Sequence, residues 1–367
     1  MHLLLKSNKS CELSDSLPEK GIIISLISPV LTNLIPECIT IQNLCSSNKY
    51  VMNYKDIPEE ELRQAIRDLK KEKNAIILAH YYQEPGIQEV ADFIGDSLGL
   101  SKQAAETDAD IILFAGVHFM AETASILNPD KKVLIPDLNA GCSLADSCQP
   151  EDFQRFVDRY PDHKVVTYIN CSAEIKAMSD VICTSSNALG VVNSFDEDEK
   201  IIFAPDRNFG AYLKDQTGRE MLLWDGVCDV HEVFSWEKIE RIKSQHPEAL
   251  FIAHPESKPG ILSKSDFVGS TSAMLKFVQG SEAKDFIIAT EAGILHEMSK
   301  KAPEKNLIPA PVFENNQCAC SECPYMKMNT LEKVYQTLLD ESPEVCIEEH
   351  LRNQALLPLR RMLEYTN

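Results

Sequence analysis

The sequence has no excess of basic residues and no apolar run of the kind that crosses a bilayer. Its 36 Lys and Arg stand against 56 Asp and Glu, which gives a net charge of −20 at pH 7. That sign disfavours general nucleic-acid binding, because such affinity comes from neutralising phosphates. The apolar run 21–35 is shorter than the ~20 residues of a membrane helix and contains Pro29. No membrane partner and no transmembrane helix are therefore expected.

Nucleotide-binding loops and targeting segments are also missing. Neither G-x-G-x-x-G nor G-x-x-x-x-G-K-[ST] occurs, so a dinucleotide or P-loop fold is unsupported. No secretory signal or transit peptide is evident, and the twelve cysteines lack the even spacing of a disulfide framework. We therefore expect a cytoplasmic protein in which clustered cysteines bind a metal or a cluster.

Residues 1–50 differ from the rest of the chain. They carry Cys11, Cys38 and Cys45 without a recognisable motif. We predict a poorly ordered N-terminal extension and assign it no chemistry.

The chain from Asn74 onward repeats one pattern three times. Short apolar runs alternate with amphipathic segments, as in α/β folds with parallel sheets. Each copy has a strand, a polar residue at its end, a short helix, an Asp, a second short strand and small hydroxyl residues. The copies are 75–97, 165–185 and 250–271, their strand-end residues are His80, Asn170 and His254, and their aspartates are Asp92, Asp180 and Asp266.

Each copy then continues with two further strands and a loop that contains cysteine. The third strands are expected at 111–115, 201–204 and 286–289, and the fourth at 133–136, 221–224 and 307–310. The aspartates are 88 and 86 residues apart, a period that favours triplication of a small domain over a solenoid. We predict three homologous three-layer αβα domains with short parallel sheets around a pseudo-threefold axis. Their boundaries are 54–142 plus the C-terminal helices 324–367, then 143–228, then 229–323.

The cysteine loops follow strand ends, where α/β sheets place their sites. One thiol from each copy would leave an open fourth position, which is typical of a catalytic metal or of an iron-sulfur cluster with one exposed iron. We choose Cys142, Cys228 and Cys323. Cys323 is expected to begin a helix at Pro324 whose dipole favours the thiolate.

Alternatives remain open for the other cysteines. The C-x-C-x-x-C pattern of Cys318, Cys320 and Cys323 also suits a separate redox or metal pair. Cys171, Cys183 and Cys346 are interpreted as packing residues in strand or helix contexts.

Small hydroxyl motifs follow the second strand of each copy. In Gly95–Ser97, Thr184–Asn187 and Gly269–Ser272 a Ser or Thr is expected to cap the next helix while backbone N–H groups face a ligand. These motifs predict neutral anion sites near the thiols, although Ser and Thr are also ordinary N-caps. Further polar candidates are His80, Tyr82, Tyr168, Asn170, His231, His254 and Glu256. Among these, His254, Glu256 and Tyr82 are expected to share proton transfer.

Together these motifs resemble the quinolinate synthase family over about 54–365. The stretches are AHYYQEPGIQEVADFIGDS, GVHFMAETASILNP, YIN, CTSSNA, APDRN, HPES, GST and CPYMKMNTL. The resemblance implies a transferase of NAD biosynthesis that condenses iminoaspartate with dihydroxyacetone phosphate, releasing phosphate and two waters to give quinolinate. It also implies a 4Fe-4S cluster held by three cysteines, with one open iron acting as a Lewis acid, and an L-aspartate oxidase as the partner that supplies iminoaspartate.

Matched motif by motif, the resemblance also assigns residues. The cluster ligands are Cys142, Cys228 and Cys323, and the substrate-binding residues are His80, Ser97, Tyr168, Asn170, Ser185, His231, His254, Glu256, Ser270 and Thr271. Our own assignment of catalysis is to His80, Tyr82, His254 and Glu256. Cys318 and Cys320 match an extra-cysteine pattern found in part of the family. Two other readings stay open: another 4Fe-4S hydro-lyase acting on a hydroxy acid, and a non-enzymatic iron-sulfur sensor.

Overall fold

The computed structural model describes residues 57–311 and 321–365. The predicted N-terminal extension and the pair Cys318 and Cys320 lie outside the described residues.

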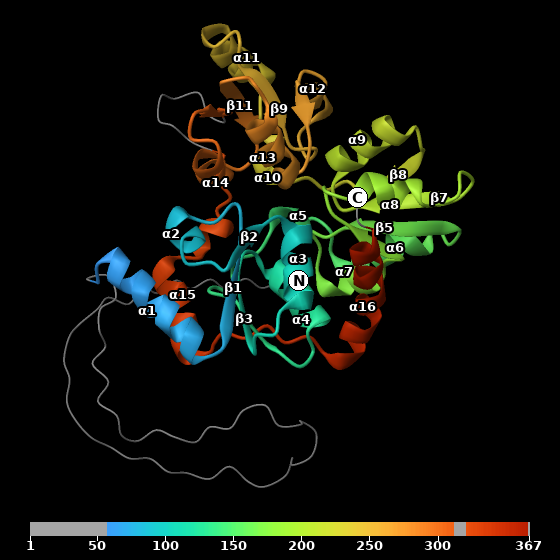
Figure 1. Ribbon diagram of the computed structural model, residues 1–367. Coiled ribbons are helices and arrows are strands. Elements are labelled where there is room, and N and C mark those ends of the chain that lie inside the picture. The colour runs from blue at the N-terminus through green and yellow to red at the C-terminus, as the bar shows by residue number, and fades with distance from the viewer. Residues whose placement is uncertain (1–56, 312–320, 366–367) are drawn as a thin grey trace, which may run out of the picture. The chain divides into compact units, whose positions relative to one another are not determined.

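Three parallel sheets of four strands form the framework (Figure 1). The first has the order β2 (Phe93–Gly95), β1 (Ala75–His80), β3 (Ile111–Ala115), β4 (Lys132–Leu134). The second has the order β6 (Val181–Cys183), β5 (His163–Tyr168), β7 (Lys200–Ala204), β8 (Met221–Leu223). The third has the order β10 (Phe267–Val268), β9 (Leu250–Ala253), β11 (Asp285–Ala289), β12 (Asn306–Pro309). The identical strand order confirms the predicted α/β fold with three layered αβα units. The domain boundaries stay predictions.

Helices connect the strands and cover the sheets. Those around the first sheet are α1 (Glu59–Glu72), α2 (Pro85–Gln88), α3 (Ser97–Glu106) and α4 (His118–Leu127). Those around the second are α5 (Ser143–Asp146), α6 (Pro150–Asp158), α7 (Ala173–Ala177), α8 (Ala188–Asn193) and α9 (Arg207–Thr217). Those around the third are α10 (Asp229–Glu232), α11 (Trp236–Gln245), α12 (Pro259–Leu262), α13 (Thr271–Gly280) and α14 (Ile294–Lys301).

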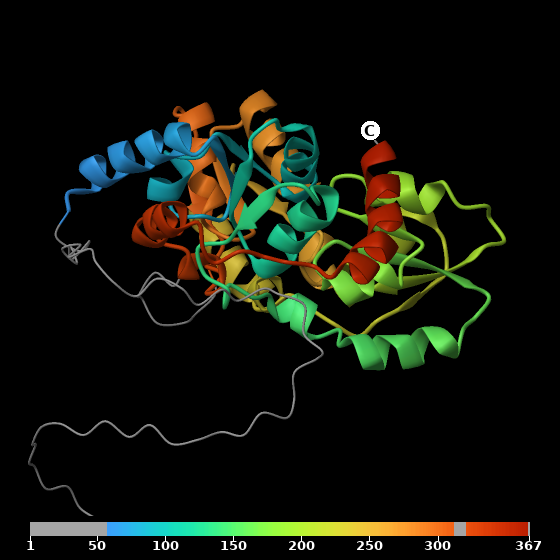
Figure 2. The ribbon, with the colours of Figure 1, turned by 90° about the horizontal axis from the view of Figure 1, so that it is seen from below.

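Two further helices close the chain. α15 (Leu331–Asp340) packs beside α1, and both lie next to the first sheet (Figures 1 and 2). α16 (Glu349–Glu364) packs on α7 and β6 of the second sheet and also contacts α4. Its Leu359 and Met362 are fully buried, so burial of this apolar face fixes α16 across two of the sheets.

One hydrogen bond recurs in all three units and defines their register. The aspartate that precedes the second strand accepts a backbone N–H from the first strand. The pairs are Asp92 with Ile77 at 2.8 Å, Asp180 with Val165 at 2.8 Å, and Asp266 with Phe251 at 2.7 Å. The aspartates identified as sequence landmarks are therefore equivalent in space, which supports the triplication.

This register corrects one predicted equivalence. Three residues beyond the bonded strand residue lie His80, Tyr168 and His254, so Tyr168 and not Asn170 occupies the place of the two histidines. Two residues further on, Tyr82, Asn170 and Glu256 are equivalent. A tyrosine at the end of β5 is a good strand former, which hid it among the apolar residues of the strand.

The segment after Cys323 is not the single helix that we predicted. A turn leads into a short 3₁₀ helix, Met326–Met328, and α15 begins only at Leu331. Thr330 caps α15 by accepting a hydrogen bond from the N–H of Lys333 at 3.3 Å, and this local cap sets the start of the helix. The prediction for Cys346 is also wrong, since it is exposed and precedes α16, whereas Cys171 and Cys183 are fully buried.

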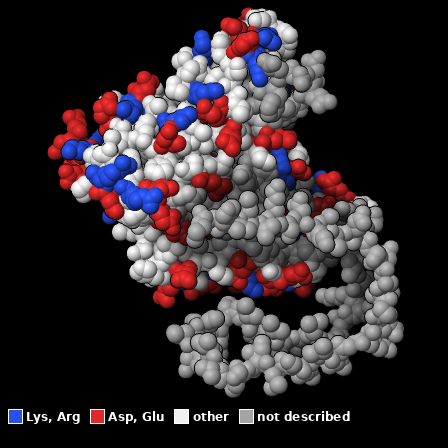
Figure 3. Space-filling view, turned by 180° about the vertical axis from the view of Figure 1, so that it is seen from behind, with Lys and Arg blue, Asp and Glu red and all other residues white. Residues whose placement is uncertain are grey.

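The surface carries interspersed charges of both signs. On the face seen in Figure 3, Lys and Arg of the described residues alternate with Asp and Glu and form no continuous basic area. Within 57–311 and 321–365, none of the helices is sufficiently long and apolar to cross a membrane.

Candidate functional site

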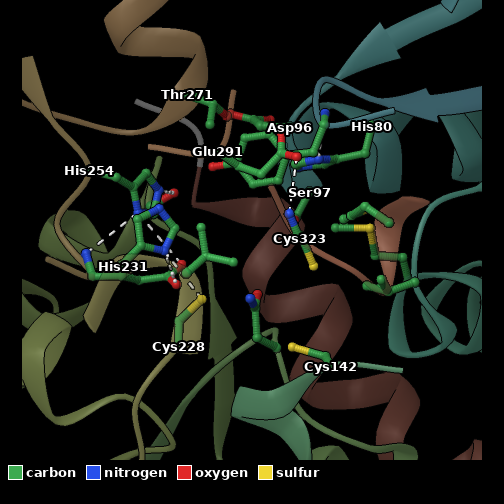
Figure 4. Close-up of a pocket in the computed structure, with 18 of the residues that line it drawn as sticks. His80, Asp96, Ser97, Cys142, Cys228, His231, His254, Thr271, Glu291 and Cys323 are labelled. Carbon is green, nitrogen blue, oxygen red and sulfur yellow. Dashed lines mark hydrogen bonds and ion pairs between the residues drawn. The ribbon is translucent and has the colours of Figure 1, made fainter. Parts of the chain in front are cut away.

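Side chains from all three units line one pocket. The pocket holds about 630 Å³ of space, including its opening to solvent. Every predicted site residue except Ser270 contributes to its wall (Figure 4). Most follow the carboxyl ends of strands, where the strand order places the crevice of each sheet.

The three chosen cysteines enter the pocket from three separate loops. Cys142 and Cys228 each directly precede a short helix, α5 and α10, and Cys323 opens the turn before α15. Their sulfur atoms point into the same part of the pocket (Figure 4). The sequence prediction therefore selected thiols that the fold does bring together.

The environment of these thiols suits a soft metal centre. Burial raises the pKa of Cys142, Cys228 and Cys323 above the ordinary value, so the bare thiols keep their protons at neutral pH. A bound cation removes that penalty by stabilising the thiolates. Among the described residues no fourth thiol lines this pocket, and a set of three thiols fits a cluster with one open iron.

A smaller group beside Cys228 also has metal-binding geometry. One donor atom each from Cys228, His231 and Glu256 lies within 4.8 Å of the others. Such a mixed sulfur, nitrogen and oxygen set is typical of zinc ligands in proteins.

Glu256 is the centre of a buried hydrogen-bond network. The Tyr168 hydroxyl donates to Oε1 at 2.6 Å, and His231 Nδ1 lies 3.0 Å from Oε2. His254 Nδ1 lies 3.6 Å from Oε1. Burial alone would raise the pKa of Glu256, but the adjacent His231 ring and the hydrogen bond from the Tyr168 hydroxyl outweigh it and lower that pKa. Glu256 therefore stays an anion although its side chain is buried.

The neighbouring titratable groups are held neutral. Burial lowers the pKa of His80 to about 4 and that of His254 to about 3. Burial also raises the pKa of Tyr82 and Tyr168 well above the ordinary value. These neutral imidazoles and phenols surround the Glu256 carboxylate. Together they form a set of acids and bases that can pass protons to one another inside the pocket.

Thr290 joins the outer parts of this network. The Tyr82 hydroxyl lies 2.7 Å from Thr290 Oγ1, and His231 Nε2 lies 3.1 Å from the same atom. Tyr82 is thereby linked to His231 and, through it, to Glu256.

Hydroxyl groups line another part of the pocket, at the N-termini of α3, α8 and α13. Ser97, Ser185 and Thr271 line the wall. The predicted capping role holds only for Ser270, whose side chain accepts from the N–H of Ala273 at 3.3 Å. In the first unit the cap is Asp96, which accepts from Gly99 at 2.9 Å, because a carboxylate is the stronger acceptor.

These three N-terminal turns are joined to one another. The Ser186 hydroxyl donates to Asp96 Oδ2 at 2.6 Å, and its oxygen lies 2.9 Å from Ser270 Oγ. Ser270 is thus linked through Ser186 to Asp96, which lines the wall, although Ser270 itself does not.

Sequence reasoning missed two acidic residues beside the cysteines, Asp206 and Glu291. Both are fully buried, and Glu291 lines the pocket. Burial raises the pKa of both, although Lys327 lies 3.2 Å from Glu291. The sequence did contain a signal for these two acids, since each stands two residues after the last residue of the third strand of its unit. That equivalence becomes clear only once the structure aligns the strands of the three units.

Comparison with known proteins identifies the family. The family model described as quinolinate synthetase A protein matches residues 64–364. The chain belongs to the quinolinate synthetase A family. It is 62% identical over 312 residues to a quinolinate synthase of Microcystis aeruginosa, a match that covers 85% of this chain and 97% of the relative. It is 61% identical over 304 residues to one of Gloeothece citriformis, covering 83% and 94%. It is 59% identical over 312 residues to one of Trichodesmium erythraeum, covering 85% and 96%.

Proposed function

We propose that this chain is a quinolinate synthase, a transferase that condenses iminoaspartate with dihydroxyacetone phosphate in NAD biosynthesis. The products are quinolinate, one phosphate and two waters. One observation carries the proposal: three thiols and a buried proton-transfer network from three sheets meet in one pocket, in a chain about 60% identical to proteins of that name.

Cys142, Cys228 and Cys323 would hold a 4Fe-4S cluster. When bound, the cluster supplies a Lewis acid at the iron that has no protein ligand, which assists the loss of a hydroxyl group. The three thiols are partly buried in the pocket wall, which supports this assignment.

The proton transfers belong to the network around Glu256. The condensation forms a carbon–carbon bond, closes an imine and loses two waters, and each of these steps moves protons. Glu256 is the anionic base that accepts a proton, while Tyr82, Tyr168 and the neutral His80 and His254 carry protons to and from the substrate. The hydrogen bond from Tyr168 keeps the Glu256 carboxylate in one orientation.

Polar groups that carry no charge would bind the anionic parts of the substrates. Ser97, Ser185 and Thr271 present hydroxyls at the pocket wall, where the N-termini of α3 and α13 add favourable dipoles. Asn170 Oδ1 is buried without a hydrogen-bond partner among the described residues, so it is an acceptor for a substrate N–H or O–H.

We also propose that an L-aspartate oxidase supplies iminoaspartate. A location in the reducing cytoplasm fits the need for three reduced thiols.

The test is an anaerobic assay of the purified chain with both substrates. Quinolinate and phosphate should appear in equal amounts, and Glu256→Gln should abolish most of the turnover. A chain that carries a cluster, forms no quinolinate and dehydrates a hydroxy acid would support the hydro-lyase reading instead.

A further inference from the structure

Comparison of the three units identifies one equivalent position that carries a different type of residue in each unit. It lies two residues after the last residue of each third strand, and its occupants are Val117, Asp206 and Glu291. Two of the three occupants are fully buried carboxylates. Each unit sends its cysteine loop past the same strand end, so this position is placed to hold that loop.

Glu291 makes this contact directly. The backbone N–H of Cys323 donates to Glu291 Oε1 at 3.2 Å, and the N–H of Gly293 donates to Oε2 at 2.6 Å. Both carboxylate oxygens therefore hold backbone amides, one of them the amide of a proposed cluster ligand. Hydrogen bonds to a buried charged acceptor are among the stronger ones in proteins.

Two further bonds attach the same loop to the same strand end. The Ser321 hydroxyl donates to the Thr290 carbonyl at 2.6 Å, and the N–H of Ala292 donates to the Ser321 carbonyl at 3.0 Å. The segment 321–323 thus lies against 290–292 through three hydrogen bonds, and Glu291 supplies the bond nearest the thiol.

Lys327 extends this contact to the proton-transfer network. Its Nζ lies 3.2 Å from Glu291 Oε1 and donates to the Tyr82 carbonyl at 2.9 Å. The Glu291 carboxylate also packs closely against Gly293 and Tyr82, because a Cβ on Gly293 would lie 2.8 Å from both Glu291 Oε2 and the Tyr82 backbone. Glu291 and Lys327 are therefore a tightly packed connection between Cys323 and Tyr82.

In the first unit the end of the third strand is held by a different side chain. The side chain of Val117 cannot accept a hydrogen bond, and the strand end is instead held by Asn329, whose side chain donates to the Gly116 carbonyl at 2.7 Å. The N–H of His118 also donates to the Ala140 carbonyl at 2.7 Å, two residues before Cys142.

We propose that Glu291 is a positioning residue for the metal centre: it fixes the backbone of Cys323 and, through Lys327, ties that ligand to Tyr82. The proposal rests on the proposed function in so far as Cys323 is taken as a cluster ligand. Glu291 acts on the centre through the cysteine backbone and makes no bond to the metal.

The test compares Glu291→Gln and Glu291→Ala with a matched control, Glu297→Gln. Glu297 is also buried, and it is paired with Lys300 and Lys301 on α14 away from the pocket wall. Each anaerobically purified protein is mixed with an iron chelator and the loss of cluster absorbance is followed. We expect loss about tenfold faster for Glu291→Ala, an intermediate rate for Glu291→Gln, and the wild-type rate for Glu297→Gln.

Two readouts separate positioning from general damage. Loss of the negative charge in Glu291→Gln should raise the reduction potential of the cluster, whereas Glu297→Gln, which changes a buried carboxylate away from the pocket wall, should leave that potential at the wild-type value. Lys327→Met should also speed cluster loss, and the double variant with Glu291→Gln should be no faster than the faster single variant, because the pair acts as a unit.

The outcomes are distinguishable. If wild type binds a cluster and Glu291→Gln matches Glu297→Gln in both rate and potential, this inference is wrong and the proposed function stands. If wild type binds no cluster, or Cys323→Ala retains it, the proposed function itself fails. Should Glu291→Ala fail to fold by far-UV circular dichroism, the isosteric Glu291→Gln decides the question.

Discussion

Replacing Tyr168 by Phe removes one atom from the centre of the pocket. The lost hydroxyl donates to Glu256 Oε1 at 2.6 Å, and the ring packs edge-on against Phe209 with 5.0 Å between the centroids. The ring contacts survive in Phe, so the change is confined to the hydrogen bond. Glu256 keeps its contact with His231.

The size of the effect follows from the nature of that bond. A hydrogen bond to a charged group contributes about 1.5 to 3 kcal/mol. If the bond orients Glu256 for proton transfer, its loss appears in the barrier, and each 1.36 kcal/mol lowers the rate about tenfold. We therefore expect kcat/KM for quinolinate formation to fall between about tenfold and 150-fold, with iron content unchanged.

Tyr212→Phe is the matched control. Tyr212 stacks on the same Phe209 but does not line the pocket. Both variants are assayed anaerobically for quinolinate at saturating and limiting substrate. The reasoning fails if Tyr168→Phe keeps the wild-type kcat/KM, or loses no more than Tyr212→Phe.

Three more predictions follow from particular contacts. Burial lowers the pKa of His80 from 6.5 to about 4, so between pH 6.5 and 4 the unfolded chain binds a proton at His80 that the folded chain does not. The free energy of unfolding, measured by urea titration, should therefore fall by up to about 3 kcal/mol as the pH drops from 6.5 to 4. In His80→Asn this fall with pH should be smaller. A Cβ on Gly226 would lie 2.5 Å from the Pro205 carbonyl oxygen, so Gly226→Ala should displace the Cys228 loop and lower the iron bound per chain, whereas Gly260→Ala, with open space around it, should not. Asp180→Ala removes the acceptor of the Val165 N–H and should lower the free energy of unfolding by about 1.5 to 3 kcal/mol in urea titration, while Asp215→Ala on an exposed face should leave it unchanged.

The fold was predictable because the repeated residues each have a structural role that can be recognised from the sequence. Apolar strand runs give the sheets, and Asp92, Asp180 and Asp266 mark the same hydrogen bond in each unit. The positions of the cysteine loops after the fourth strands then follow from the parallel topology.

Details that depend on neighbours in space were not predictable. Tyr168 was passed over as the equivalent of His80 because a tyrosine at a strand end looks like any β-former. The start of α15 was misplaced because Thr330 makes a local cap that overrides the run of helix formers before it. Glu291 escaped notice because its partners, the Cys323 amide and Lys327, come from more than thirty residues away.

The most direct test of the account is the amount of iron and acid-labile sulfide bound per chain after anaerobic purification, measured for wild type and for Cys142→Ala, Cys228→Ala and Cys323→Ala. The account predicts about four of each in wild type and a loss of cluster in all three variants. Zinc held at Cys228, His231 and Glu256, or a cluster that survives the loss of any one of these cysteines, would contradict it.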